Sequence, residues 1–118
     1  MSWLPPVVDK SVVLYHYVVV RSDLPLGTVC AQIVHAAGES SPGNLPPHTH
    51  AVVLSVTNED ALLELEARLL AADVECYPIR EPDAPWNGAL MAIGLPPQRK
   101  QQLVEYLGHY SLLNSLSV

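Results

Sequence analysis

The chain has 118 residues, which fits one domain, and its 49% hydrophobic and 15% charged residues exclude a disordered protein. An apolar share this high in so short a chain suggests burial between subunits, and we expect a homodimer. The net charge is −6 and the six Lys and Arg residues are scattered, which argues against a protein that grips nucleic acid by its phosphates.

Residues 1–11 contain Pro5-Pro6 and are expected to form an arm on the surface, followed by a single domain over residues 12–118. The arm lacks the basic and apolar regions of a signal peptide. No apolar stretch approaches the roughly 20 residues that are needed to span a bilayer. We therefore expect a cytoplasmic protein.

The first half of the domain predicts two buried strands around a helix. Residues 12–20 are rich in β-branched and aromatic side chains, which is typical of a central strand. Residues 28–39 carry apolar side chains at helical spacing, residues 40–50 hold the prolines of a loop, and residues 51–56 predict the second strand.

The second half predicts a helix, a strand pair and a last helix. Asn58 is a good helix cap, and a leucine stripe continues to about residue 72. Residues 74–79 predict the third strand. The connection that follows is too short for a crossover helix, so a fourth strand over residues 89–93 should run antiparallel to the third. Pro96-Pro97 would open a helix that ends near Gly108.

This order predicts an α/β domain of three layers, with a mixed four-stranded sheet and helices on both faces. The two βαβ units should have right-handed crossovers. A ferredoxin-like two-layer sandwich is the main alternative. It usually needs an early hairpin, which the sequence lacks.

The cysteines and histidines offer no strong metal or nucleophile site. Cys30 and Cys76 lie in apolar contexts and are expected to be small, buried, reduced side chains. His48 and His50 could bind zinc with Cys76 or His16 as a third ligand, but a lone H-x-H is not a site signature. Glycine-rich phosphate loops are absent, so we expect no metal and no cofactor.

A polar stripe runs along the first helix. Its members, Thr28, Gln32, His35 and Glu39, are spaced four, three and four residues apart. The stripe is either the solvent face of an amphipathic helix or part of a site. Its position favours a site, because ligands of open α/β sheets bind beyond the carboxyl ends of strands, beside helix N-termini.

The same segment resembles the first motif of type II peptidyl-tRNA hydrolases. Residues 19–24 read V-V-R-S-D-L, Gly27 lies in the turn, and residues 31–37 read A-Q-I-V-H-A-A. Residues 92–97, A-I-G-L-P-P, are similar to the closing strand and turn of that family. The match covers roughly residues 13–110.

The resemblance implies a three-layer α/β domain, usually dimeric, that cleaves the ester between a peptide and the terminal ribose of tRNA without a metal. Gln32 matches the active-site glutamine of the family and His35 its helix histidine. The family also uses a carboxylate from the loop before the last strand. Glu81 and Asp83 are the candidates here, and we favour Glu81 because it follows the third strand directly.

Departures from the family pattern point to weakened hydrolysis or another substrate. The family lysine four residues before the glutamine is Thr28 here, and the glycine turn is about two residues shorter. The threonine that follows the loop carboxylate has no clear counterpart around residues 85–87. This chain looks closest to a divergent branch that lacks the lysine. Without that cation the best electrostatic stabiliser of the reaction is missing.

If the chain is a hydrolase of this kind, each candidate residue would have a role in catalysis or binding. Glu81 or Asp83 would act as general base toward a water, or would orient His35 to do so. Gln32 would position the substrate carbonyl, and Thr28 with nearby helix N–H groups would polarise it.

The roles of Arg21 and Trp86 each have two possible interpretations. Arg21 would bind a phosphate or carboxylate, or would simply pair with Asp23 on the same strand face. Trp86 would stack on a nucleotide base, or would cap the core or a dimer contact. A non-catalytic binding module that kept the fold is the alternative to the esterase.

Overall fold

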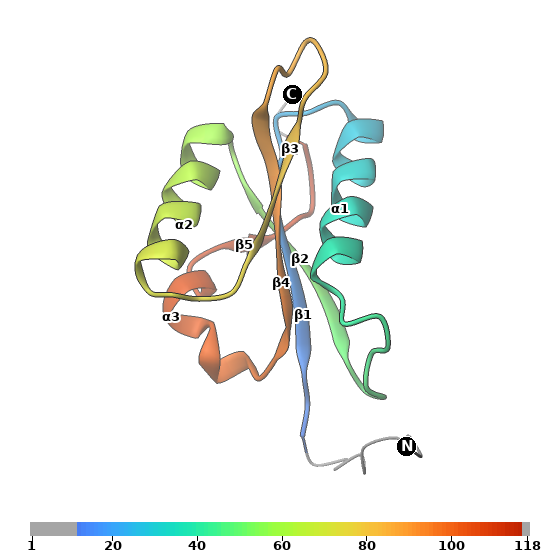
Figure 1. The fold of residues 1–118 in the computed structure, drawn as a ribbon, viewed down its shortest axis with the longest axis vertical. Helices are drawn as coiled ribbons and strands as arrows, with labels where there is room; N and C mark the ends of the chain where they lie inside the picture. The colour runs from blue at the N-terminus through green and yellow to red at the C-terminus, as the bar shows by residue number, and fades with distance from the viewer. Residues whose placement is uncertain (1–11, 117–118) are drawn as a thin grey trace, which may run out of the picture.

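The computed structural model describes residues 12–116, which form a five-stranded mixed sheet with helices packed against it (Figure 1). The strands are β1 (Tyr15–Arg21), β2 (His50–Val56), β3 (Tyr77–Glu81), β4 (Ala89–Gln98) and β5 (Ser111–Leu112). The helices are α1 (Leu26–Ser40), α2 (Glu59–Ala71), the short 3₁₀ turn η1 (Lys100–Gln102) and α3 (Val104–Leu107). The expected N-terminal arm, residues 1–11, lies outside the described residues.

The sheet has the order β3-β4-β1-β2-β5. Strands β1 and β2 are parallel. Strand β4 runs antiparallel to β3, as the short connection between them predicts, and also antiparallel to β1. The connection from β1 to β2, through α1, runs toward the β5 edge of the sheet, and the connection from β2 to β3, through α2, runs back to the opposite edge. Because the two connections run in opposite directions, two right-handed crossovers must place their helices on opposite faces of the sheet. Helices α1 and α2 do so (Figure 1), which rules out the two-layer alternative.

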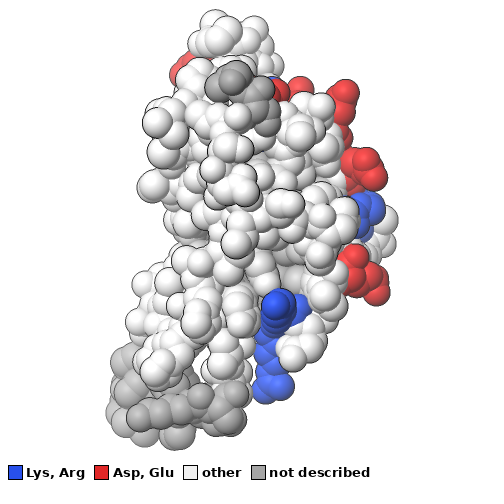
Figure 2. All heavy atoms as spheres, turned by 180° about the vertical axis from the view of Figure 1, so that it is seen from behind, with Lys and Arg blue, Asp and Glu red and all other residues white. Residues whose placement is uncertain are grey.

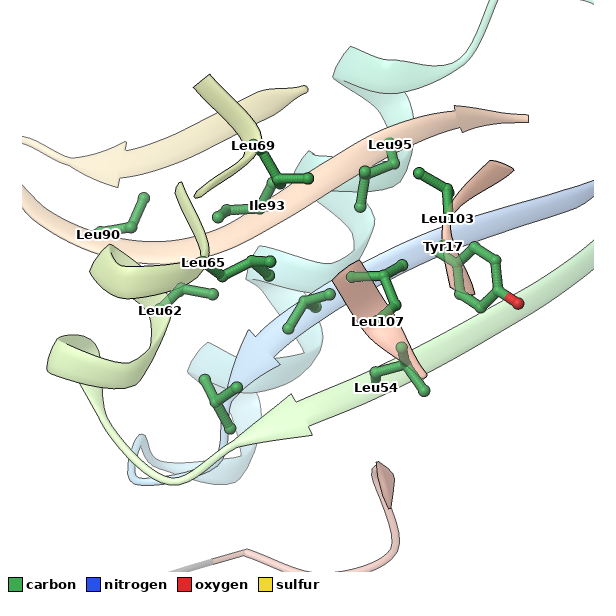
Figure 3. Packing of buried hydrophobic residues seen from close by; sticks show 12 residues of the cluster. Tyr17, Leu54, Leu62, Leu65, Leu69, Leu90, Ile93, Leu95, Leu103 and Leu107 are labelled. Carbon is green, nitrogen blue, oxygen red and sulfur yellow. The ribbon is translucent and has the colours of Figure 1, made fainter. Parts of the chain in front are cut away.

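Alternating side chains of β1 divide the core into two layers. Tyr17 and Val19 pack under α2 and α3, whereas Val18 and Val20 pack under α1. The leucine stripe of α2, which the sequence predicts, lies over the side chains of β4 (Figure 3). The helices are thus held to the sheet from both sides by buried aliphatic side chains.

Local sequence explains where α2 begins and how closely α1 approaches the sheet. The side chain of Asn58 accepts a hydrogen bond from the backbone N–H of Ala61 at 3.0 Å, so the predicted cap is confirmed. Gly94 lies where β4 passes α1. A Cβ on this glycine would lie 2.3 Å from the carbonyl oxygen of Ala36, so only glycine permits this approach.

The prediction of a helix that opens at Pro96-Pro97 is wrong, because both prolines lie inside β4. Strand β3 begins at Tyr77, the partner of Gly94, and does not extend past it, so the last residues of β4 have β1 on one side and no strand on the other. Proline lacks the N–H that a central strand donates and is tolerated at such an edge. The helical turns begin only at Lys100 and end at Leu107, beside the predicted stop at Gly108.

The sheet also has one strand more than the four that the sequence predicts. The two residues of β5 pair antiparallel with β2, from Leu54 to Ser55. Other boundaries differ by a few residues: β1 begins at Tyr15, and the third strand spans residues 77–81 instead of 74–79. Glu81 is therefore the last residue of β3 and does not follow it.

Cys30 also departs from expectation. It is exposed on α1, whereas Cys76 is half-buried and burial raises the pKa of its thiol, with Glu66 adding to the effect. Within residues 12–116, no helix is both long and apolar enough to cross a membrane.

Candidate functional site

A pocket of about 360 Å³ lies between the first two turns of α1 and the loop that joins β3 to β4. We call it the α1–hairpin pocket. It is lined by Gly27, Thr28, Ala31, Gln32, Glu81, Asp83, Ala84 and Trp86. The structure therefore brings together the glutamine and both loop carboxylates that the sequence singles out, although they are about 50 residues apart in the chain.

Gln32 has an unusual position for a polar side chain. It is only 7% exposed, because the hairpin loop covers it, and its Oε1 has no hydrogen-bond partner among the described residues. An unpaired buried polar atom costs roughly 1–3 kcal/mol. Such an atom requires an explanation, and one explanation is a partner that arrives with a ligand or a water.

The carboxylates are held by a tight loop. The backbone N–H of Gly88 donates to the carbonyl oxygen of Glu81 at 2.7 Å, and the N–H groups of Trp86 and Asn87 both donate to the backbone carbonyl oxygen of Asp83 at 3.0 Å. Asn87 and Gly88 have φ angles of 48° and 91°, the left-handed region that asparagine and glycine tolerate best. The backbone N–H of Asp83 also donates to Oε1 of Glu81 at 3.2 Å.

The opposite wall of the pocket is the N-terminus of α1. Pro25 precedes the helix, no side chain caps it, and its first turn contains no acid. Among residues 12–116, the backbone N–H groups of Leu26, Gly27 and Thr28 have no hydrogen-bond partner. These groups carry the partial positive charge of the helix end. The pocket thus has donors on one wall and carboxylates on the other.

Arg21 lies beneath the pocket and does not line it. Its guanidinium donates to both carboxylate oxygens of Asp23, at 2.7 and 3.0 Å, and to the carbonyl oxygen of Leu90 at 3.2 Å. The hydrogen bonding to Asp23 raises the pKa of Arg21 and outweighs the opposing effect of burial, and the charges of Asp23 and Glu59 add to the rise. The guanidinium carbon is 5.8 Å from the centre of the Trp86 ring. Of the two alternatives for Arg21, ligand binding or an ion pair with Asp23, the structure shows the ion pair. The guanidinium also packs against the ring of Trp86.

His35 does not line the α1–hairpin pocket. It lies one turn further along α1, in a second hollow of about 310 Å³ whose other walls are Glu39 and residues 76–80. Its Nε2 is 3.7 Å from a carboxylate oxygen of Glu39, and both side chains are more than half exposed. His35 is three positions beyond Gln32 on the helix, and this displacement brings it opposite Ile79 and Arg80 instead of Glu81.

Two glutamates on α2 hold neighbouring groups, and neither contact has a recognisable signal in the sequence. Glu66 accepts two hydrogen bonds from Arg80, at 2.7 and 2.9 Å. Glu59 accepts a hydrogen bond of 2.7 Å from the backbone N–H of Leu90. Because Arg80 and Arg21 are each paired with a carboxylate, they do not form the open positive rim that would suit a phosphate chain.

The histidines of the loop do not assemble a metal site with the suggested third ligands. The ring of His50 stacks on Tyr15, with 5.2 Å between ring centres. His16 is buried and its Nε2 is 2.7 Å from the hydroxyl of Ser40. Within the described part of the chain, no three His, Cys, Asp or Glu side chains are grouped so that they could hold a metal ion.

Comparison with known proteins supports the fold alone. No protein-family model matches the chain, and no curated protein matches its sequence. A solved structure of a protein of unknown function from Agrobacterium tumefaciens is similar, with a TM-score of 0.55 and 16% sequence identity. The similarity covers 86% of this chain and 98% of that one. At this identity the likeness extends to the arrangement of helices and strands, and not to an activity.

Proposed function

We propose that this chain is an ester hydrolase of the peptidyl-tRNA hydrolase type II class, and that it cleaves the bond between a peptidyl or aminoacyl group and the terminal ribose of tRNA in the α1–hairpin pocket. The observation that carries the proposal is the convergence of an unpaired Gln32 amide and the Glu81 carboxylate on one pocket at a helix N-terminus. The sequence motif on β1 and α1 and the three-layer α/β architecture support the same family.

Glu81 is the general base of the proposed reaction. It is half-buried at the end of β3 and its carboxylate lines the pocket, where it takes a proton from a water as the water oxygen attacks the ester carbonyl carbon. The tetrahedral intermediate then expels the ribose oxygen, which receives the proton back from Glu81. The products are a free carboxylic acid and the ribose hydroxyl. Asp83, which is more exposed, orients Glu81 through the loop.

The oxyanion of the intermediate is stabilised by the wall opposite Glu81. Thr28 replaces the lysine of the family, so the remaining donors are its hydroxyl, the side-chain amide of Gln32 and the free N–H groups of the first turn. Donors of this kind contribute roughly 10²–10³-fold each when they are already in place. A site built from neutral donors is expected to be slower than one that has the lysine.

The charges indicate that recognition is confined to the ester end of the substrate. Arg21 and Arg80 are both paired with carboxylates, and the α1–hairpin pocket is lined by two acidic side chains and no basic one. The tRNA body would therefore gain little from this surface. Trp86 would stack on the terminal base, and the acyl chain would extend toward the hollow beside His35.

The second candidate is a non-catalytic binding module, favoured by the outer surface of α1. Leu26 and Val34 are 64% and 72% exposed, and the exposed Cys30 lies between them at helical spacing. From behind, most of the surface carries no charged side chain (Figure 2). A surface of this composition suits contact with another protein, which we take to be a second copy.

Single-turnover hydrolysis of N-acetyl-aminoacyl-tRNA separates the two candidates. The wild-type chain should release the acyl group above the background rate, and Gln32→Ala should reduce the rate about 100-fold, because it removes a donor to the oxyanion. Glu64→Gln is the matched control, since Glu64 is exposed on α2 and away from the pocket. Equal rates at background for wild type and Gln32→Ala would eliminate the hydrolase and leave the binding module.

A further inference from the structure

A second pocket, of about 340 Å³, lies on the face of the sheet opposite α1. Its floor is formed by β1 and β2 and its roof by α3. Tyr15 and Tyr17 line it from β1, Leu54 from β2, and Leu103 and Leu107 from the α3 region. We call it the tyrosine pocket. It shares no residue with the α1–hairpin pocket, so the two sites are separated by the sheet.

The walls of the tyrosine pocket are aromatic and aliphatic. The rings of Tyr15 and Tyr17 are stacked, with centres 6.0 Å apart and planes 18° apart. Figure 3 shows Tyr17 at the end of the leucine cluster, beside Leu103 and Leu107, with its hydroxyl directed away from the leucines. Pockets of this volume and lining are typical of small-molecule sites, in which a few polar groups fix the orientation of an apolar ligand.

Two polar groups of the tyrosine pocket have neither a hydrogen-bond partner nor a counter-ion among the described residues. The hydroxyl of Tyr17 bonds to no residue within 12–116. Burial raises its pKa, with Tyr15 adding to the effect, so the hydroxyl stays protonated and can donate. Lys100 lines the pocket with its ammonium 5.8 Å from the centre of the Tyr15 ring.

Lys100 has no acidic partner among the residues that the structure describes. The ion pairs within residues 12–116 join Arg21 to Asp23, His35 to Glu39 and Arg80 to Glu66, and no Asp or Glu lines the tyrosine pocket. This is notable in a chain whose net charge is −6. Figure 2 shows basic atoms gathered low on the rear surface, and acidic atoms along one side with a basic group among them.

We propose that the tyrosine pocket binds a small monocarboxylic acid that carries an aromatic ring or a short alkyl chain. The carboxylate pairs with the ammonium of Lys100 and accepts a hydrogen bond from Tyr17. The apolar part lies against Tyr15 and the leucines, where it is removed from water. A cationic ligand would be repelled by Lys100, and a dianion would bring a second charge into a pocket with one cation.

Titration with phenylacetate, followed by the methyl NMR signals of the isotope-labelled full chain, tests this site. The methyl groups of Leu54, Leu103 and Leu107 should shift, whereas that of Val29, under α1, should not. Phenylacetamide has the same shape without the charge and should bind about tenfold more weakly, which corresponds to roughly 1.4 kcal/mol. Lys100→Met should abolish the preference for the acid, and Lys100→Arg should retain it.

Several results would overturn the proposal. These are an absence of shifts at the three leucines at millimolar phenylacetate, equal affinity for the acid and the amide, and an unchanged preference in Lys100→Met. Lys100 is exposed, so its variants should fold, and the unchanged signals of α1 and α2 would verify this. Shifts of the same leucines on concentrating the protein alone would instead assign the pocket to a second copy, which also overturns the proposal.

Discussion

His16 connects β1 to the end of α1 through a buried hydrogen bond. Its Nε2 is 2.7 Å from the hydroxyl of Ser40, which itself donates to the carbonyl oxygen of Ala36 at 2.7 Å. The ring nitrogen must therefore carry the proton as a donor. Burial lowers the pKa of His16 below its ordinary value of 6.5. The folded chain thus favours neutral histidine, whereas the unfolded chain binds a proton near pH 6.5.

This difference predicts a pH-dependent stability. Because the unfolded state binds more protons, the contribution of His16 is complete above about pH 6.5 and is lost as the pH falls through the lower folded pKa. The free energy of unfolding in urea should therefore decrease from pH 7.5 to pH 5.5, and His16→Gln should flatten this dependence. His109 is exposed, so His109→Gln should leave it unchanged. An equally steep dependence in His16→Gln would contradict this assignment.

Site residues could be predicted from the sequence where local chain geometry fixes them. Thr28 and Gln32 lie one turn apart and necessarily share a helix face, and Arg21 and Asp23 are close enough in sequence to pair. The position of His35 relative to Glu81 depends instead on where β3 passes α1. The contacts of Glu59 and Glu66 depend on α2 and the sheet, over 14 to 31 residues of chain. The spacing of residues along the chain does not predict these contacts, because they depend on how the helices pack on the sheet.

At the scale of elements, the contact between α1 and β4 depends on Gly94. A methyl group here would meet the backbone carbonyl of Ala36 and the side chain of Ser40, and backbone cannot move aside without shifting the helix. Gly94→Ala should therefore lower the free energy of unfolding by roughly 1–3 kcal/mol.

The control for this prediction is Gly38→Ala in the same helix. Gly38 is exposed and has nothing within 4 Å of an added Cβ, so alanine there should be neutral or stabilising by about 0.5–1 kcal/mol. Urea denaturation of both variants measures the difference. A Gly94→Ala chain as stable as the wild type would mean that α1 and β4 are further apart than described.

Helices and strands could be predicted where a local sequence pattern is strong. They were missed where strand pairing within the sheet determines the structure. The leucine stripe and the Asn58 cap are sufficient to predict α2. A proline pair is a common helix start, but here it lies at a strand edge that is open only because β3 is short. Strand β5 has two residues and exposed side chains, so it has no periodicity to detect. Its strand character derives from pairing with β2.

At the scale of the whole molecule, the uncharged outer surface of α1 predicts self-association. The expected homodimer would cover Leu26, Cys30 and Val34, which are otherwise exposed to water. Sedimentation velocity at micromolar concentration should give twice the mass of the 12.8 kDa chain. Val34→Glu should yield monomers, because it buries a charge without a partner in the interface.

Leu70→Glu is the matched control, since Leu70 is 63% exposed on α2, on the other side of the sheet. It should remain dimeric. A wild-type chain that sediments as a monomer, or dissociation by Leu70→Glu alone, would locate the association elsewhere or exclude it.

A double-mutant cycle of Gln32 and Glu81 measures whether the two side chains act on one substrate in one pocket, as we propose. The rates of N-acetyl-aminoacyl-tRNA hydrolysis by Gln32→Ala, Glu81→Gln and the double variant are compared with wild type. Groups that act as a unit give strongly non-additive losses. We predict that Glu81→Gln lowers kcat/KM by about 10²–10⁴-fold and that adding Gln32→Ala lowers it little further. Losses that simply multiply, or a Glu81→Gln chain as fast as wild type, would contradict a shared site.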